Sequence, residues 1–263
     1  MRTRWKILIA AIVAVPAITL TWFWYWGQQN LARPTQAALA ALQSDAEVSV
    51  EQDDWLVLRP TAGASRGGVI LYPGANCDVR GYAPVLRELA RAGYTVVAVP
   101  MPFNFAIFAP WRASEVMDDF PGIDRWVLIG HSMGGAMAGY YAHKHPDRLA
   151  GVIFWDAYPP ESSDLSGLPL TVWSIHRATP DGEMSEKFKP WVKLFPPATR
   201  WVPIRGGIHM YFGSFDGGGY VEEWAPQISR EEQLARVTRA TLAALDEMLG
   251  KRGEGRAGAE ERT

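Results

Sequence analysis

A serine flanked by glycines lies near the middle of this 263-residue chain. The segment Gly130-His131-Ser132-Met133-Gly134 matches the pattern G-x-S-x-G, in which a serine occupies a sharp turn between a strand and a helix. An apolar, strand-like run at residues 125–129 precedes it, and small residues suited to a helix follow it. This setting predicts that Ser132 is a nucleophile raised above the end of a sheet; the alternative is an ordinary tight turn with an inert serine.

A serine hydroxyl is a weak nucleophile at neutral pH and needs a base, which in turn needs an acid to orient it. Where the serine occupies such a turn, the order along the chain is serine, acid, histidine. His209 follows an expected strand at residues 199–204 and precedes the last helix, so a loop could return it to Ser132. We therefore expect His209 to be the base, the alternative being a surface loop histidine.

The acid has more than one candidate. Asp181 follows an expected strand at residues 170–175, the strand before the histidine strand, and that strand most often supplies the acid in this order. Asp181 and Gly182 also form an Asp-Gly pair, and this dipeptide is common in turns that have no catalytic role. Asp156, at the end of the preceding strand, is the main alternative. Asp164 and Glu183 are weaker candidates, so Asp181 is the predicted acid.

An acyl-transfer site also needs N–H groups that stabilise a developing oxyanion. One is expected from Met133, directly after the serine, and one from the loop that follows the first core strand. That loop contains Gly74 and Ala75. We expect Met133 and Ala75 to form the oxyanion hole, with Gly74 as the next choice.

Short apolar runs alternate with helical segments through most of the chain, which predicts a parallel sheet covered by helices on both faces. A hairpin at residues 48–58 is expected to open the domain. The last helix begins with a capping box formed by Ser229 and Glu232, and Gly250 follows it at the position of a stop. The expected core strands are residues 68–72, 94–99, 125–129, 149–155, 170–175 and 199–204.

The N-terminus predicts a membrane anchor. Residues 7–26 carry no charge, and 20 residues of helix span about 30 Å, the thickness of the hydrocarbon core of a bilayer. Basic residues precede this run and aromatic residues end it, which predicts a cytoplasmic N-terminus and a catalytic domain on the extracytoplasmic side. A cleaved signal, giving a secreted protein, and a buried core helix are the alternatives. The expected division is an anchor at 1–26, a linker at 27–46, one domain at 47–250 and a disordered tail at 251–263.

Composition excludes several classes of protein. Twenty-six basic residues nearly balance 28 acidic ones, so no basic surplus points to nucleic acid. Cys77 is the one cysteine of the chain, which rules out an internal disulfide framework and a multi-cysteine metal site. The chemistry expected of Ser132 requires neither a metal nor a cofactor.

These motifs resemble the α/β-hydrolase superfamily, and in particular its small bacterial dienelactone-hydrolase-like group. The resemblance covers about residues 48–250. It implies an α/β fold with a mostly parallel sheet of about eight strands, and it assigns Ser132, Asp181 and His209 to a triad. Dienelactone hydrolases themselves use a cysteine nucleophile, so their substrate does not carry over. The motifs that carry the resemblance are Tyr72-Pro73-Gly74, Gly130-His131-Ser132-Met133-Gly134-Gly135, Asp181-Gly182 and Gly206-Gly207-Ile208-His209.

The substrate pocket is expected just past the carboxyl end of a strand, where ligands bind in such sheets. Phe103, Phe105 and Phe108 lie there, and they either line this pocket or pack as core residues under a helix. The expected function is cleavage of carboxylic esters through an acyl-enzyme. The alternatives are acyl transfer or peptide hydrolysis by the same triad, and a non-catalytic membrane-tethered binding protein on the same fold.

Overall fold

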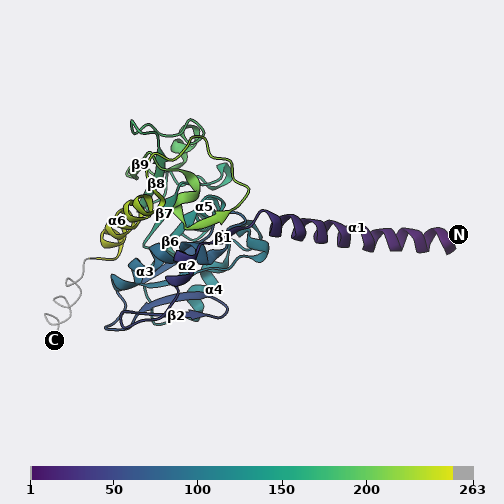
Figure 1. Cartoon of the computed structure of the whole chain (residues 1–263), viewed down its shortest axis with the longest axis horizontal. Coiled ribbons are helices and arrows are strands. Elements are labelled where there is room, and N and C mark those ends of the chain that lie inside the picture. Colours follow the sequence, from purple (N-terminus) through teal and green to yellow (C-terminus); the bar gives the residue numbers. More distant parts are fainter. Residues whose placement is uncertain (1, 251–263) are drawn as a thin grey trace.

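The computed structural model describes residues 2–250, and it describes the side chains of residue 5 and residues 12–250. Helix α1 (Arg2–Gln29) extends away from a body that contains all the other elements (Figure 1). Where side chains are described, no helix is both long and apolar enough to cross a membrane. The membrane anchor expected at residues 1–26 is thus not shown and stays a prediction. The tail expected at 251–263 lies outside the described residues.

The body is built on an eight-stranded sheet with the strand order β2-β3-β5-β4-β6-β7-β8-β9. Strands β4 to β9 are parallel to one another, and β3 runs against its neighbours β2 and β5. The mostly parallel sheet of about eight strands is therefore confirmed. Its strands are β2 (Val48–Gln52), β3 (Leu56–Pro60), β4 (Gly68–Tyr72), β5 (Thr95–Ala98), β6 (Trp126–His131), β7 (Gly151–Trp155), β8 (Val172–Ala178) and β9 (Arg200–Arg205).

Helices cover both faces of this sheet. Side chains alternate between the two faces along each strand, so a strand inside the sheet packs against both layers of helices. In β4, Val69 and Leu71 pack into the cluster that contains α3 and α6, whereas Ile70 and Tyr72 pack into the cluster that contains α4 and α5. The continuous apolar runs in the sequence reflect this burial on both sides. The remaining α-helices are α2 (Gln36–Ala40), α3 (Ala83–Arg91), α4 (Arg112–Asp119), α5 (Met133–Lys144) and α6 (Arg230–Leu249). The short 3₁₀ helices are η1 (Val79–Tyr82), η2 (Pro102–Asn104), η3 (Ala106–Phe108), η4 (Pro146–Arg148), η5 (Glu161–Ser163), η6 (Lys189–Leu194) and η7 (His209–Phe212).

The last helix begins and ends as its sequence predicts. The Ser229 hydroxyl accepts a hydrogen bond from the N–H of Glu232 at 3.1 Å, which satisfies one of the free donors of the first turn. Gly250 follows the helix with a φ of 89°, a conformation that side chains disfavour. Both ends of α6 are therefore set by local residues, the N-cap Ser229 at its start and Gly250 after its last turn.

The segment expected to be a linker contributes to the body instead. Strand β1 (Ala32–Pro34) pairs antiparallel with β10 (Phe215–Gly217), although the two are far apart in the sequence. The hydroxyl groups of Thr35 and Ser214 lie 2.7 Å apart beside this ribbon. The side chains of Ala38 and Leu42 are buried in the core. The folded domain therefore begins near residue 32, before the expected boundary at 47.

Candidate active site

Ser132 makes the turn between β6 and α5. Strand β6 ends at His131 and α5 begins at Met133, so the change of direction falls on the serine. Its φ of 53° and ψ of −123° lie outside the regions that residues other than glycine usually occupy. Strained backbone of this kind persists only where the surrounding structure holds it, and it clusters at functional sites. The strand–turn–helix setting predicted for Ser132 is confirmed.

Two glycines provide the space for this turn. A Cβ atom at Gly130 would lie 2.5 Å from the carbonyl oxygen of Gly134, and one at Gly134 would lie 2.3 Å from the carbonyl oxygen of Tyr72. Both obstacles are backbone atoms, which cannot turn away as the end of a side chain can. The glycines of the G-x-S-x-G pattern are therefore needed so that α5 can pack closely against β4 and β6.

His209 follows β9 and opens the short helix η7. Its Nδ1 lies 2.5 Å from Oδ2 of Asp156, and both side chains are almost fully buried. The carboxylate is an acceptor, so Nδ1 carries the hydrogen and Nε2 of a neutral ring is free to accept a proton. His209, Asp156 and Ser132 all line one cavity. His209 and Ser132 thus face one cavity, and the carboxylate beside His209 belongs to Asp156 rather than to Asp181.

Asp181, the predicted acid, is not brought to the site. It is exposed, in a turn closed by a hydrogen bond from the Gly182 N–H to the Thr179 carbonyl oxygen at 2.8 Å. The register of the sheet explains the difference. Trp155, the last residue of β7, pairs with His131, the last residue of β6.

Because of this pairing, the residues that follow the two strands, Asp156 and Ser132, emerge side by side. Strand β8 continues to Ala178, beyond the end of β7, and Asp181 follows it in the turn. The prediction of Asp181 is therefore corrected to Asp156, the alternative that the sequence left open.

Asp156 is held as a carboxylate despite its burial. Burial alone would raise its pKa, but the hydrogen bond with His209 and the charge of Arg177 lower the pKa to about 2. The Arg177 guanidinium lies 3.3 Å from Oδ2, and the Arg177 backbone N–H donates to Oδ1 at 3.1 Å. Asp156 also has a positive φ of 44°. The acid is thus ionised and fixed in direction from both of its oxygens.

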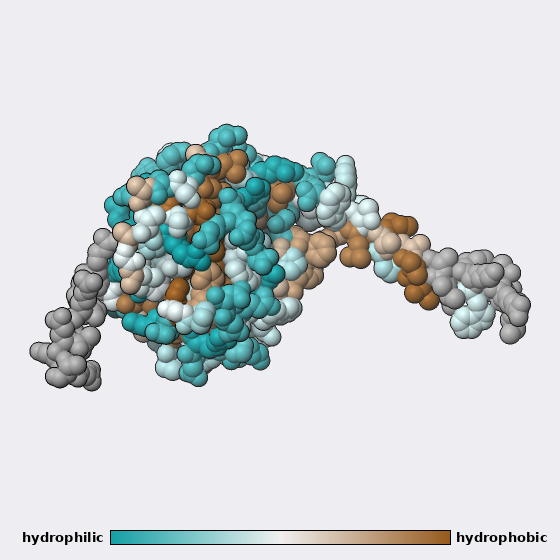
Figure 2. All heavy atoms as spheres, turned by 90° about the horizontal axis from the view of Figure 1, so that it is seen from below, coloured by the Kyte–Doolittle hydropathy of each residue, from teal (hydrophilic) through white to brown (hydrophobic). Residues whose placement is uncertain are grey.

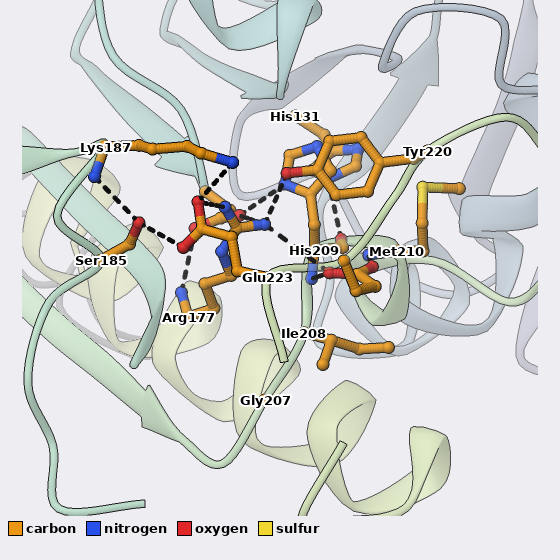
Figure 3. Close-up of polar contacts among 12 residues, drawn as sticks. His131, Arg177, Ser185, Lys187, Gly207, Ile208, His209, Met210, Tyr220 and Glu223 are labelled. Atoms are coloured by element: carbon orange, nitrogen blue, oxygen red, sulfur yellow. Dashed lines mark hydrogen bonds and ion pairs between the residues drawn. The ribbon is translucent and has the colours of Figure 1, made fainter. Parts of the chain in front are cut away.

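A loop between β10 and α6, whose role the sequence did not reveal, completes the surroundings of His209 (Figure 3). The Glu222 carboxylate accepts the backbone N–H groups of His209 at 2.9 Å and Met210 at 2.7 Å. The ring of Tyr220 stacks on that of His209 with centroids 4.1 Å apart, and its hydroxyl accepts from Arg177 at 2.8 Å. These contacts fix both the backbone and one ring face of the histidine. No motif marks them, because they depend on how a long loop folds back.

Within the described residues, the N–H groups of the two oxyanion-hole candidates, Met133 and Ala75, have no hydrogen-bond acceptor. Met133 is the first residue of α5, so its N–H has no acceptor within the helix, and the helix end adds a partial positive charge. The N–H of Gly74 already donates to the Tyr82 hydroxyl at 2.9 Å. Among the hydrogen bonds of residues 2–250, none uses the N–H of Ala75. This favours Ala75 over Gly74 as the second donor.

The cavity beside Ser132 has a volume of about 390 Å³ and a mostly apolar wall. Its apolar lining includes side chains from α5 and from the segment after β7, and its polar lining includes Asp156 beside His209. Such a wall suits an uncharged, apolar group with a reactive centre at one end. The lining residues are Ile107, Ser132, Met133, Ala136, Met137, Asp156, Ala157, Tyr158, Arg177, Ser185, Lys187, Phe188, His209 and Tyr220.

The three phenylalanines predicted to line this cavity do not line it. Phe103, Phe105 and Phe108 surround Phe23 of α1, with ring centroids 5.6 to 6.4 Å from it. Ile107, within the same segment, reaches the cavity instead. The segment lies at the expected end of the sheet, but its 3₁₀ turns point the aromatic rings toward α1. The substrate-binding prediction is therefore corrected for all three.

A metal centre is not evident in the part of the chain that the structure describes, since no group of three or more His, Cys, Asp or Glu side chains could hold an ion there. Cys77 is buried, and burial raises the pKa of its thiol to about 12. It is therefore protonated at neutral pH and is not a competing nucleophile.

Comparisons with known proteins identify the family of the chain. The sequence model of the alpha/beta hydrolase family matches residues 68–234. The abhydrolase domain-containing protein lid-1 of Caenorhabditis elegans is 28% identical over 120 residues, which are 44% of this chain and 26% of that protein. The probable esterase PIR7A of Oryza sativa subsp. indica is 30% identical over 128 residues, or 43% of this chain and 46% of that protein. The chain thus matches less than half the length of each of these relatives.

A solved structure supports the fold. The ferulic acid esterase from Streptomyces cinnamoneus has a TM-score of 0.54 and 20% sequence identity, over 71% of this chain and 68% of that chain. At this identity the similarity concerns the fold alone. Since the family's sequence model covers more than half of the residues, the chain belongs to the alpha/beta hydrolase family.

Proposed function

We propose that the protein is a serine hydrolase that cleaves carboxylic esters with Ser132, His209 and Asp156. The observation that carries the proposal is the 2.5 Å contact between His209 Nδ1 and Asp156 Oδ2, made in the cavity that Ser132 also lines. A buried carboxylate behind an imidazole, next to a serine on a strained turn, is the arrangement that activates a hydroxyl. The name of the rice relative, a probable esterase, is consistent with this activity.

In the proposed reaction, His209 Nε2 takes the Ser132 proton while Oγ attacks the ester carbonyl carbon. The N–H groups of Met133 and Ala75 stabilise the oxyanion, and Asp156 stabilises the imidazolium that forms. The carbonyl then re-forms, the C–O bond to the alcohol breaks, and His209 protonates the departing alcohol. Water, deprotonated by His209, attacks the acyl-enzyme, and the carboxylic acid leaves as Ser132 regains its proton. None of these steps requires a metal or cofactor.

The cavity wall favours an uncharged acyl or alcohol group. Met137 and Phe188 are among its apolar lining residues, and a flexible methionine adapts to groups of different shape. Arg177 does not provide a free positive charge, because it is paired with Asp156 and Glu223 at 3.3 and 3.2 Å. We therefore propose neutral esters with a small or medium apolar chain as substrates.

A fluorophosphonate probe tests this function directly, because it reacts preferentially with an activated serine. We expect stoichiometric labelling of the full chain, with the adduct on the peptide that contains Ser132 by mass spectrometry. Labelling should abolish hydrolysis of p-nitrophenyl esters in parallel. A protein that neither reacts with the probe nor hydrolyses any ester of the series contradicts the proposal and favours a binding role for the fold.

We further propose that α1 attaches the protein to a membrane and that the basic residues ahead of it leave the catalytic domain on the extracytoplasmic side. Support comes from apolar side chains that are exposed along the described part of the helix, such as Ile12, Ile18 and Trp24. Figure 2 shows this apolar surface in brown where α1 leaves the body. At the base of α1, Phe23 packs against Phe108, which is itself 48% exposed. The apolar surface of the helix therefore continues onto the body.

Fractionation of cells that make the full chain tests the attachment. We expect the protein in membranes that have been washed with alkaline carbonate, with an intact mass that includes α1. The double variant I12E/I18E, in which two charges enter the exposed apolar surface, should shift to the wash. Recovery of the unaltered chain in the wash, or of a chain that has lost α1, would argue against an anchor.

A further inference from the structure

His131, the residue before the serine, is buried beside the proposed catalytic residues and does not line the cavity. Its side chain lies at the end of β6, and the residue is 1% exposed. Its Nδ1 lies 2.7 Å from the Tyr82 hydroxyl, and its Nε2 lies 3.1 Å from the backbone carbonyl oxygen of His209. Figure 3 shows the ring beside His209, and the two ring centroids are 4.6 Å apart. A histidine in this place can control where the catalytic histidine lies.

The hydrogen-bond partners fix the proton on this ring. The His209 carbonyl oxygen can only accept, so His131 Nε2 must carry the hydrogen. His131 Nδ1 is then the acceptor, provided that the ring is neutral, and the Tyr82 hydroxyl donates to it. Burial lowers the pKa of His131 well below its usual range, which keeps the ring neutral. The Tyr82 oxygen in turn accepts the N–H of Gly74 at 2.9 Å.

All three hydrogen bonds therefore point the same way, from Gly74 through Tyr82 and His131 to the His209 carbonyl. The chain begins next to Ala75, passes the residue before Ser132, and ends on His209. Hydrogen bonds in a buried, fully satisfied network strengthen one another and favour one arrangement. A single hydrogen-bond network thus connects the loop that contains Ala75, the turn that contains Ser132, and the backbone of His209.

The His209 backbone is held on both sides. Its carbonyl is bound by His131, and its N–H is bound by Glu222 at 2.9 Å. The ring orientation is set separately, by Asp156. Loss of the carbonyl contact would leave the Asp156 bond in place but allow the backbone of η7 to shift relative to the serine turn. A misplacement of about 1 Å can lower a rate by about 100-fold.

We propose that His131 is a positioning residue for catalysis, which sets the distance between His209 and Ser132 through its Nε2–H bond to the His209 carbonyl. This inference rests on the proposed function, since it assumes that His209 is the base. His131 does not touch the reacting atoms and takes no part in proton transfer.

A matched pair of variants isolates that hydrogen bond. In His131→Gln the side-chain amide nitrogen can reach the position of Nε2 and still donate to the carbonyl. In His131→Asn the side chain is shorter, of similar polarity, and ends before that position. We expect kcat of the Gln variant within about fivefold of wild type, and a 10- to 100-fold lower kcat for the Asn variant. KM should be nearly unchanged in both, because the cavity wall is unaltered.

The decisive readouts are kcat, KM and the second-order rate of fluorophosphonate labelling, measured well below each variant's unfolding temperature. A merely structural role would lower the unfolding temperature but leave kcat equal in the Asn and Gln variants, and that result overturns the inference. A wild-type chain that does not react with the probe at all removes the proposed function and this inference together. If the Asn variant does not fold, His131→Met decides, because its side chain fills the space of the ring without a donor; a kcat about tenfold below that of the Gln variant is expected, and an equal kcat overturns the inference.

Discussion

Replacing Ser132 with alanine is expected to lower kcat for p-nitrophenyl esters by about 10⁶-fold and to abolish fluorophosphonate labelling. Oγ is the atom that forms the acyl-enzyme in the proposed reaction, and the change removes it without disturbing the backbone that makes the turn. KM should change little, because the apolar wall of the cavity remains. The measurement is steady-state hydrolysis with the labelling stoichiometry as a second observable.

Ser163→Ala is a matched control for this variant. Ser163 is fully buried, whereas Ser132 is half-buried, and within the described residues the Ser163 hydroxyl has no hydrogen-bond partner. It lies in η5, outside the residues that line the cavity. We expect wild-type kcat and full labelling for it. Equal labelling of the Ser132→Ala protein would mean that another residue is the nucleophile.

Asp156→Asn is expected to have the next largest effect, a decrease in kcat of about 10⁴-fold. The carboxylate accepts from His209 Nδ1–H and stabilises the imidazolium, whereas an amide presents a donor to Nδ1 and favours the wrong tautomer. Asp181→Asn is the matched control and should keep kcat within about twofold of wild type, because its side chain is exposed and does not line the cavity. Loss of activity in Asp181→Asn alone would restore Asp181 as the acid.

Comparison with Asp156→Asn also predicts how the free energy of unfolding of the wild-type protein depends on pH. The folded protein holds the pKa of Asp156 at about 2, below its ordinary value of 3.8, so the carboxylate stabilises the fold above about pH 4. This stabilisation is lost as the pH falls toward 2. The free energy of unfolding of wild type, relative to Asp156→Asn, should therefore fall by about 2 kcal/mol between about pH 5 and about pH 2. Urea unfolding at several pH values measures this, and a constant difference would contradict it.

The sequence predicts the sheet well because the signals that define it are local. Strands buried on both faces have continuous apolar runs, and the strand at residues 68–72 is found with those bounds. The turn at Ser132 was also predictable, since the need for glycine at Gly130 and Gly134 arises from backbone contacts within one strand–turn–helix unit. The start and stop of α6 follow from single residues at its ends.

The errors concern contacts that no local pattern encodes. The choice between Asp156 and Asp181 depends on the relative lengths of β7 and β8, and a shift of a few residues at a strand end decides it. Glu222 binds the His209 backbone from a loop with no regular spacing. The phenylalanines at 103, 105 and 108 were placed at the right end of the sheet, but all three rings pack against Phe23, and the position of α1 is not encoded in their local pattern.

The ribbon formed by β1 and β10 has a consequence for where the chain can be shortened. Strand β10 leads directly into the loop that carries Tyr220 and Glu222, and it has β1 as its pairing partner. Removing residues 30–46 together with α1 would strip that partner away and leave the edge of β10 unpaired, next to the contacts that hold His209. We therefore expect that a chain trimmed to β2, the first strand of the large sheet, loses a support of the contacts around His209.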